Sequence, residues 1–305
     1  MTSPRIIVLT HPRAVSTAFE RVFTTRRDIL ATFHEPFNIA FYFGPEAVSE
    51  RYKGTSATVA TSEFSAVTYK AVLDSFAEAE ERGKRIFVKE MAFSLFEPDG
   101  KLSSIVPSLG AGVEPGNPTV LPLEVLQQFH FTFLIRHPRR SIPSFYRCTT
   151  PPLSQGTGFD GFLPSEAGYL ELRRMLDFCI EKGLVDKSRL IVIDADDLLD
   201  EPEKIVRSYC DRVAIDFRPE MLEWSDADRE HAARLVPTVF QGFHGNVDGS
   251  SSLKPRTHAQ KTVSVEDENK EWAEKYGSEA QRVIRETVDA NIPHYEYLKQ
   301  YCLKV

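Results

Sequence analysis

Short apolar segments alternate with helical patterns along the first two thirds of this chain of 305 residues. The apolar segments are rich in β-branched and aromatic residues, as is typical of strands buried on both faces of a sheet, and they occupy 5–10, 31–34, 85–89, 130–135 and 189–193. Helical patterns cover 17–26, 63–82 and 166–182, and Gly83 and Gly183 follow the last two as helix stops. This alternation predicts an α/β protein in which helices flank a parallel sheet of about five strands.

The last third of the chain is polar and helical. Helical patterns cover 202–213, 225–235 and 267–290, and no second set of strands follows them. The segments 102–123 and 242–255 are rich in loop-forming residues and are interpreted as loops, because no separate core flanks them. We therefore expect residues 1–305 to form a single domain with a helical C-terminal part.

Charge and composition disfavour several kinds of partner. The formal net charge of −7 argues against a polyanion such as DNA, because nucleic-acid binders carry a basic excess or a basic patch. The N-terminal apolar run is too short for a signal peptide or a membrane span, so we expect a cytoplasmic protein with no membrane partner. A homodimer is one oligomeric state that the sequence allows, and no motif specifies it. No metal is expected, because ligand spacing is absent among His231, His244, His258 and His294.

The tripeptide His-Pro-Arg occurs twice, each time between an apolar segment and a helical pattern. The first copy ends at Arg13 and is followed by Ser16 and Thr17; the second follows Arg136 and precedes Ser144. The first turn of a helix leaves backbone N–H groups unpaired and carries a partial positive charge, which suits phosphate. An arginine can bind phosphate oxygens in a bidentate manner, and hydroxyl groups add further donors. The alternative is an ordinary capped helix start with its arginine in solvent.

Both junctions follow strands of the expected parallel sheet, whose carboxyl ends share one edge. Two anion sites on that edge predict a ligand with two separated phosphates. Neither G-x-x-x-x-G-K-[ST] nor a G-x-G-x-x-G after a strand is present, which disfavours an ordinary ATPase or a dinucleotide enzyme. A nucleotide with both 5′ and 3′ phosphates fits better.

These motifs resemble those of the P-loop sulfotransferases. The segment THPRAVST at 10–17 resembles the 5′-phosphosulfate loop of that family, Pro-Lys/Arg-Ser-Gly-Thr-Thr. The segment FLIRHP at 133–138 resembles the 3′-phosphate motif, in which a serine stands eight positions after the arginine, as Ser144 stands after Arg136. HEPFN at 34–38, KEMA at 89–92 and SSLKPR at 251–256 follow in the family's order. The chain is most similar to the bacterial and fungal branch with the pattern HPR-x-V-S-T-A-F-E-R.

The resemblance implies 3′-phosphoadenosine 5′-phosphosulfate (PAPS) as donor, 3′,5′-ADP as its product, no metal, and a hydroxyl or amine of a small molecule as acceptor. The 5′-phosphosulfate would be held by the loop residues Arg13, Ala14, Val15, Ser16, Thr17 and Ala18. The 3′-phosphate would be held by Arg136 and Ser144, with Lys254 and Arg256 closing over it.

The sequence departs from the family pattern at the third strand. Many relatives have Lys-Thr-His there, with the lysine assisting the bridging oxygen and the histidine acting as base; the matching residues here are Lys89, Glu90 and Met91. A thioether cannot accept a proton in catalysis, so a base must come from Glu35, His34 or Glu90.

Glu35 ranks first among these bases. It precedes a proline, which disfavours the helical region and predicts an extended turn at the end of the strand, near the phosphate loop. A carboxylate that caps a helix or a loop is the alternative role for Glu35, and a satisfied buried polar group is the alternative for His34.

The second departure is Val15, which stands where the common loop has glycine. Valine predicts an ordinary negative φ at this position. The change is either a feature of the subfamily or the mark of a loop that no longer binds PAPS.

The acceptor site is expected to be aromatic. Aromatic residues follow the second strand, at Phe37, Phe41, Tyr42 and Phe43, and the third, at Phe93 and Phe96. Glu90 and Met91 end the third strand. We interpret these residues as substrate contacts for an aromatic or secondary-metabolite acceptor, with burial of the rings in the core as the alternative. Two other functions stay open: a repurposed fold that catalyses a cyclisation, elimination or isomerisation without PAPS, and a noncatalytic nucleotide-binding protein.

Overall fold

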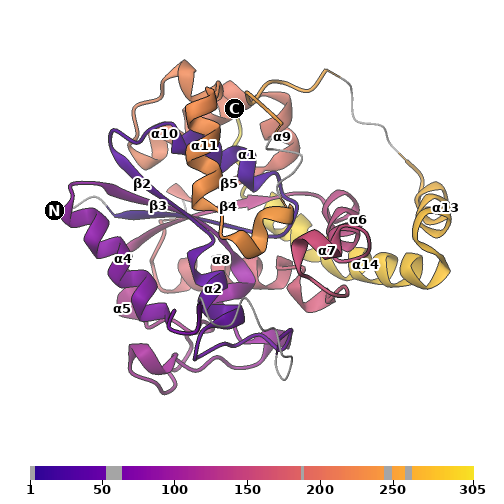
Figure 1. Ribbon diagram of the computed structural model, residues 1–305, viewed down its shortest axis with the longest axis horizontal. Coiled ribbons are helices and arrows are strands. Elements are labelled where there is room, and N and C mark those ends of the chain that lie inside the picture. Colours follow the sequence, from indigo (N-terminus) through magenta and orange to yellow (C-terminus); the bar gives the residue numbers. More distant parts are fainter. Residues whose placement is uncertain (1–3, 53–63, 187–188, 244–248, 258–262) are drawn as a thin grey trace.

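The computed structural model describes residues 4–52, 64–186, 189–243, 249–257 and 263–305 (Figure 1). The strands are β1 (Arg5–Thr10), β2 (Leu30–His34), β3 (Arg85–Met91), β4 (Phe129–Ile135) and β5 (Val192–Asp194). The α-helices are α1 (Ser16–Thr24), α2 (Pro36–Phe43), α4 (Tyr69–Glu81), α5 (Leu123–Leu126), α6 (Pro138–Cys148), α7 (Ser154–Thr157), α8 (Tyr169–Glu181), α9 (Ala195–Asp200), α10 (Pro202–Val213), α11 (Asp226–Leu235), α13 (Val265–Tyr276) and α14 (Ser278–Lys299). Short 3₁₀ turns are η1 (Ala92–Leu95), η2 (Pro98–Gly100), η3 (Pro107–Leu109), η4 (Pro164–Glu166), η6 (Pro219–Leu222) and η7 (Thr238–Phe243).

The five strands form one sheet in the order β2-β3-β1-β4-β5, and every neighbouring pair is parallel. The register aligns Thr10 at the end of β1 with Met91 on β3 and with Leu134 on β4. The carboxyl ends of these strands therefore lie at one edge of the sheet. The predicted α/β class and the parallel sheet of about five strands are confirmed.

Both faces of the sheet are covered by helices. On β1, Ile7 and Leu9 face a core that includes residues of α2, α4, α8 and α14, whereas Ile6 and Val8 face a second core with α1, α9 and α10. Figure 1 shows α2, α4 and α8 on one side of the strands and α1, α10 and α11 on the other. Burial on both sides explains why the strand sequences are continuously apolar.

Several predicted boundaries differ from the observed ones. β5 is shorter than 189–193 and ends at Asp194. The helix expected over 63–82 begins at Tyr69, where the Thr68 side chain accepts a hydrogen bond from the Ala71 N–H at 3.0 Å; residue 63 lies outside the described residues. The helix expected over 166–182 begins at Tyr169, after the η4 turn.

The single helix expected over 267–290 is two helices. Gly277 separates α13 from α14 with φ 90° and ψ 161°, a conformation that residues with a Cβ rarely adopt. α14 then continues past Pro293 to Lys299 and packs against α6, α8 and α13.

None of the helices in the described ranges combines the length and the apolar character needed to cross a bilayer. The same ranges contain no group of three or more histidine, cysteine, aspartate or glutamate side chains placed to hold a metal ion.

Candidate active site

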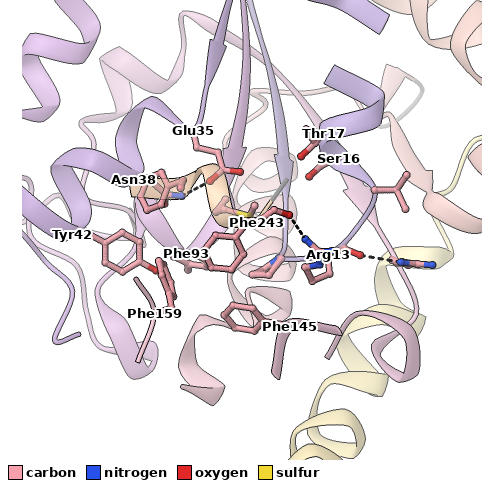
Figure 2. A pocket seen from close by; sticks show the side chains of 15 residues that line it. Arg13, Ser16, Thr17, Glu35, Asn38, Tyr42, Phe93, Phe145, Phe159 and Phe243 are labelled. Atoms are coloured by element: carbon pink, nitrogen blue, oxygen red, sulfur yellow. Dashed lines mark hydrogen bonds between the residues drawn. The ribbon is translucent and has the colours of Figure 1, made fainter. Parts of the chain in front are cut away.

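A cavity of about 220 Å³ opens where β1, β2, β3 and β4 end. One part of its wall is polar and consists of Arg13, Ser16, Thr17, Glu35, Asn38 and Arg136; the other is aromatic and consists of Tyr42, Phe93, Phe145, Phe159, Phe240 and Phe243. Pro12, Val15 and Met91 complete the lining. Figure 2 shows the rings of Tyr42, Phe93 and Phe159 gathered on the side away from Ser16 and Thr17.

Two residues of the loop between β1 and α1 have a left-handed backbone conformation. Arg13 has φ 64° and Val15 has φ 65°, so the expectation of a negative φ at Val15 is wrong. The valine is held in a conformation that costs an L-residue roughly 1–2 kcal/mol, and it packs against the core beneath α1. Val15 is the N-cap of α1, and its side chain has no acceptor with which to cap the first-turn N–H groups.

Arg13 and Arg136 are brought together by direct contacts between the two junctions. The Arg136 Nη1 donates to the Arg13 carbonyl at 3.2 Å, and the Arg13 Nε donates to the Ser144 hydroxyl at 3.1 Å. The Arg13 Nη1 donates to the Phe243 carbonyl at 2.7 Å, one of the contacts drawn in Figure 2. The side chain of Arg13 thus reaches from its own loop to the serine of the second motif.

These two arginines carry charge that no neighbouring carboxylate cancels. Within the described ranges, neither Arg13 nor Arg136 forms an ion pair, and the buried Arg136 Nε has no hydrogen-bond partner. Burial, opposed by the more distant Asp196, lowers the pKa of Arg136, and the charge of Arg13 lowers it further. Two adjacent arginines of this kind favour an anion in the cavity.

His11 links the junctions from below and was not among the predicted site residues. It is fully buried, its Nε2 accepts the Arg136 backbone N–H at 2.9 Å, and its ring stacks on Tyr169 at 4.0 Å. Burial lowers the pKa of His11 to about 3, so the ring is neutral and can accept that hydrogen bond. Its position in the repeated tripeptide was the sequence signal that could have identified it.

Glu35 lies in the cavity wall, but its backbone differs from the prediction. Glu35 has φ 48° and ψ 48°, not an extended conformation, and Pro36 is the first residue of α2. A proline at this first position loses no helical hydrogen bond, which explains why a helix can begin there. The Glu35 N–H donates to the Lys89 carbonyl at 2.7 Å, and the Glu35 Oε2 accepts from the Asn38 side chain at 2.8 Å.

Lys89 and His34 lie behind Glu35 and do not line the cavity. The Lys89 ammonium is completely buried and forms an ion pair with Glu35 Oε1. His34 is also buried, and its Nδ1 lies 2.6 Å from the carboxylate of Glu20. Glu20 was not predicted as a site residue.

Three predicted substrate contacts are displaced from the cavity. Phe37 and Phe41 are buried in the core, where Phe37 stacks on Tyr69 at 5.6 Å. Glu90 is fully buried and accepts the backbone N–H groups of Phe37 at 2.7 Å and Met91 at 2.8 Å. Burial, with the nearby charge of Glu35, raises the pKa of Glu90 to about 8, so this carboxyl is largely protonated at neutral pH.

Lys254 and Arg256 are not among the residues that line the cavity. The chain carrying them is tied to other segments, because the Leu253 N–H donates to the Leu222 carbonyl at 2.9 Å and the Arg256 N–H to the Leu199 carbonyl at 2.8 Å. The Arg256 guanidinium forms ion pairs with Asp196 and Asp200, and Lys254 lines a separate surface depression. The expectation that they close over the cavity is not supported by this placement.

Comparisons with known proteins find similarity to sulfotransferases. The family model described as "Sulfotransferase domain" matches residues 173–247, downstream of both His-Pro-Arg junctions. Sulfotransferase ppzF of Metarhizium majus (strain ARSEF 297) is 27% identical over 243 residues, which cover 72% of this chain and 70% of that protein. Sulfotransferase ppzF of Metarhizium rileyi (strain RCEF 4871) is 24% identical over 241 residues, with 72% and 70% covered. The chain is thus similar in sequence to sulfotransferases.

Among solved structures, the sulfotransferase domain from the curacin biosynthetic pathway is similar, with a TM-score of 0.46 and 15% identity over 89% of this chain and 97% of that one.

Most of the aromatic residues in the cavity wall of this sulfotransferase-like protein were not predicted from the sequence. Tyr42 and Phe93 were expected, but Phe145 comes from α6, Phe159 from the loop after α7, and Phe240 and Phe243 from η7. No pattern in those segments separates cavity-lining rings from core rings, because where the rings meet depends on how α6, the loop after α7 and η7 are placed in the fold.

Proposed function

We propose that the protein transfers a sulfuryl group from PAPS to a hydroxyl or amine of a small aromatic acceptor. One observation carries the proposal: Arg13 and Arg136, with no carboxylate paired to either in the described ranges, lie at the polar end of a cavity whose other end is aromatic. A donor with two phosphates suits the first end, and a planar apolar acceptor suits the second.

The residues at the polar end fit a nucleotide with two phosphates. In the part of the chain that the structure describes, the Arg136 Nε–H lacks a partner, and Ser16 and Thr17 line the cavity at the start of α1, where the N-cap Val15 has no capping side chain. PAPS, when bound, supplies the sulfuryl group and leaves as 3′,5′-ADP. Arg136 and Ser144 would hold the 3′-phosphate. The loop 13–18 would hold the 5′ end, where preorganised N–H groups and Arg13 stabilise the charge that develops on the leaving phosphate.

Glu35 is the base in this proposal. It is the one carboxylate among the residues that line the cavity, whereas Glu90 points its oxygens at backbone N–H groups. Lys89 acts on the reaction through Glu35, since its buried ammonium is bound to that carboxylate and does not line the cavity.

The aromatic end of the cavity favours a neutral, planar acceptor. Its rings include Phe93, Phe159 and Phe240, and no side chain there carries a charge. Burial raises the pKa of Tyr42 well above its usual value, so its hydroxyl stays protonated. We therefore expect phenols and aryl alcohols to be the preferred acceptors.

The test is a titration with 3′,5′-ADP followed by a transfer assay with labelled PAPS and a panel of phenols and alcohols. Arg136→Ala is expected to weaken 3′,5′-ADP binding ~30–100-fold, since a charged hydrogen bond contributes about 2–3 kcal/mol. Arg207→Ala is the control, because Arg207 is exposed on α10 and paired with Glu203. No binding of 3′,5′-ADP would refute the proposal and leave the repurposed enzyme; tight binding without transfer to any acceptor would indicate a noncatalytic nucleotide-binding protein.

A further inference from the structure

Four ionisable side chains form a continuous line from the cavity wall into the interior. Glu35 Oε1 is bonded to the Lys89 ammonium, Lys89 Nζ lies 3.4 Å from His34 Nε2, and His34 Nδ1 lies 2.6 Å from Glu20 Oε2. The exposed fractions of Glu35, Lys89, His34 and Glu20 are 6, 0, 4 and 3%. Of the four, only Glu35 lines the cavity, so the other three act on the reaction through it.

The contacts determine which ring nitrogen of His34 carries hydrogen. A carboxylate only accepts hydrogen bonds, so the nitrogen next to Glu20, Nδ1, must be the donor. The lone pair of a neutral ring is then on Nε2, which lies 3.4 Å from the Lys89 Nζ, a donor-only group, and farther, at 3.6 Å, from Glu35 Oε1. Glu20 thus turns His34 into an acceptor aimed at the lysine.

The charges of the four groups leave room for one more proton. Two carboxylates and one ammonium surround a neutral histidine, so one carboxylate in the group has no cationic partner. Glu20 Oε1 has no hydrogen-bond partner within the described ranges, so this carboxylate is available to stabilise a positive charge on His34. Burial makes that pairing favourable, because unbalanced charges are costly away from water.

We propose that Glu20 and His34 form a proton relay for Glu35, an inference that rests on the proposed function. As the acceptor oxygen bonds to sulfur and the bond from sulfur to the leaving phosphate breaks, the hydroxyl proton passes to Glu35. The Lys89 ammonium gives one of its protons to His34 Nε2, and the resulting amine then takes the proton from Glu35. The end state pairs two carboxylates with two cations, and Glu35 is again a carboxylate. Without the relay Glu35 would be a weak base, because a carboxylate bound to an ammonium holds an incoming proton weakly.

Glu20 is a positioning residue in this scheme, and Glu20→Gln tests its charge. The glutamine oxygen can still accept from His34 Nδ1–H, so the ring orientation survives while the negative charge is lost. We expect kcat with PAPS and a phenol to fall ~10–100-fold, as for loss of general acid–base catalysis, with KM for PAPS and the affinity for 3′,5′-ADP unchanged. Glu46→Gln is the matched control: Glu46 is a half-buried carboxylate that accepts from the Tyr69 and Ser108 N–H groups, outside the cavity lining, and its replacement should leave kcat unchanged. A kcat of Glu20→Gln within about threefold of the wild type overturns the relay.

A second readout does not depend on turnover. ¹⁵N NMR of the histidine rings, with His34 assigned from His34→Asn, should show His34 as the Nδ1–H tautomer in the wild type. A wild-type His34 protonated on Nε2, alone or on both nitrogens, overturns the inference even if sulfuryl transfer is demonstrated. The expected tautomer together with absent 3′,5′-ADP binding would leave the relay geometry standing and refute the proposed function.

Discussion

Gly242 lies where the η7 turn meets α7, and the backbone there leaves no room for a side chain. A Cβ at this position would lie 2.2 Å from the Gly156 oxygen, 2.4 Å from the Gly156 carbonyl carbon and 2.7 Å from the Thr157 nitrogen. All three are backbone atoms, so no side-chain rotation can relieve the clash. Since ordinary contact begins near 3.4 Å, Gly242→Ala must push η7 away by roughly 1 Å.

That displacement reaches the active site through Phe240 and Phe243, which line the cavity from η7. The hydrogen bond from Arg13 to the Phe243 carbonyl, now 2.7 Å, would lengthen past its useful range. Overpacking of this kind costs ~1–3 kcal/mol, which for a chain of this length lowers Tm by about 2–5 °C. The affinity for 3′,5′-ADP should fall as well, because Arg13, which would hold the 5′ end of the nucleotide, loses its hydrogen bond to η7.

Thermal unfolding and titration with 3′,5′-ADP measure both effects. Gly156→Ala is the matched control at the same contact, because a Cβ on that residue would meet no atom within 4 Å. Alanine also suits the short helix α7, so this variant should be neutral or stabilised by ~0.5–1 kcal/mol. A Gly242→Ala protein that melts within about 1 °C of Gly156→Ala would refute the steric reasoning.

Three further predictions concern the strained loop and the buried charges. Lys89→Met should lower the free energy of unfolding, measured by urea titration, by ~3–5 kcal/mol, because Glu35 stays buried without its ammonium partner. Adding Glu35→Gln should recover part of that loss. Strictly additive effects of the two substitutions would contradict the ion pair. The raised pKa of Glu90, about 8 against 4.5, means that the folded protein keeps a proton that the unfolded chain releases, so its contribution to stability is lost as pH rises from about 5 to about 8. The contribution is ~4–5 kcal/mol at most. The free energy of unfolding, measured by urea titration at several pH values in that range, should fall less steeply with pH for Glu90→Gln than for the wild type. An equal pH dependence would count against the assignment. Val15→Gly should raise the free energy of unfolding by ~1 kcal/mol, since glycine adopts φ 65° without strain, and a less stable variant would show that the packing of the valine outweighs that strain.

Local patterns predicted the secondary structure well where a single rule applied. Buried strands were found from continuous apolar runs, and α10 was predicted with its observed bounds of Pro202–Val213. The predictions failed where one sequence pattern is compatible with two backbone conformations. The residue before Pro36 was expected to be extended, but Glu35 is left-handed because its N–H bonds to the Lys89 carbonyl on the neighbouring strand.

The candidate site was predicted at its polar end and missed at its aromatic end. Both His-Pro-Arg junctions follow strands that the pattern identified, so their meeting at one edge followed from parallel pairing alone. Phe159 and Phe243 reach the cavity through loops whose paths no local pattern encodes. The order of the motifs suggested that Lys254 closes over the 3′-phosphate. Its segment is hydrogen-bonded to η6 instead, and Lys254 lines a separate surface depression.

The sequence by itself determined the α/β architecture, the parallel sheet and the two arginine junctions at its carboxyl edge, because these depend on periodicity and on the order of short motifs. Only the tertiary structure decided which charges stay unpaired. Arg256 is neutralised by Asp196 and Asp200, whereas Arg13 and Arg136 meet no carboxylate within the described ranges. The strength of an ion pair depends on the distance between two side chains and on their burial, and for residues far apart in the chain the fold alone sets both.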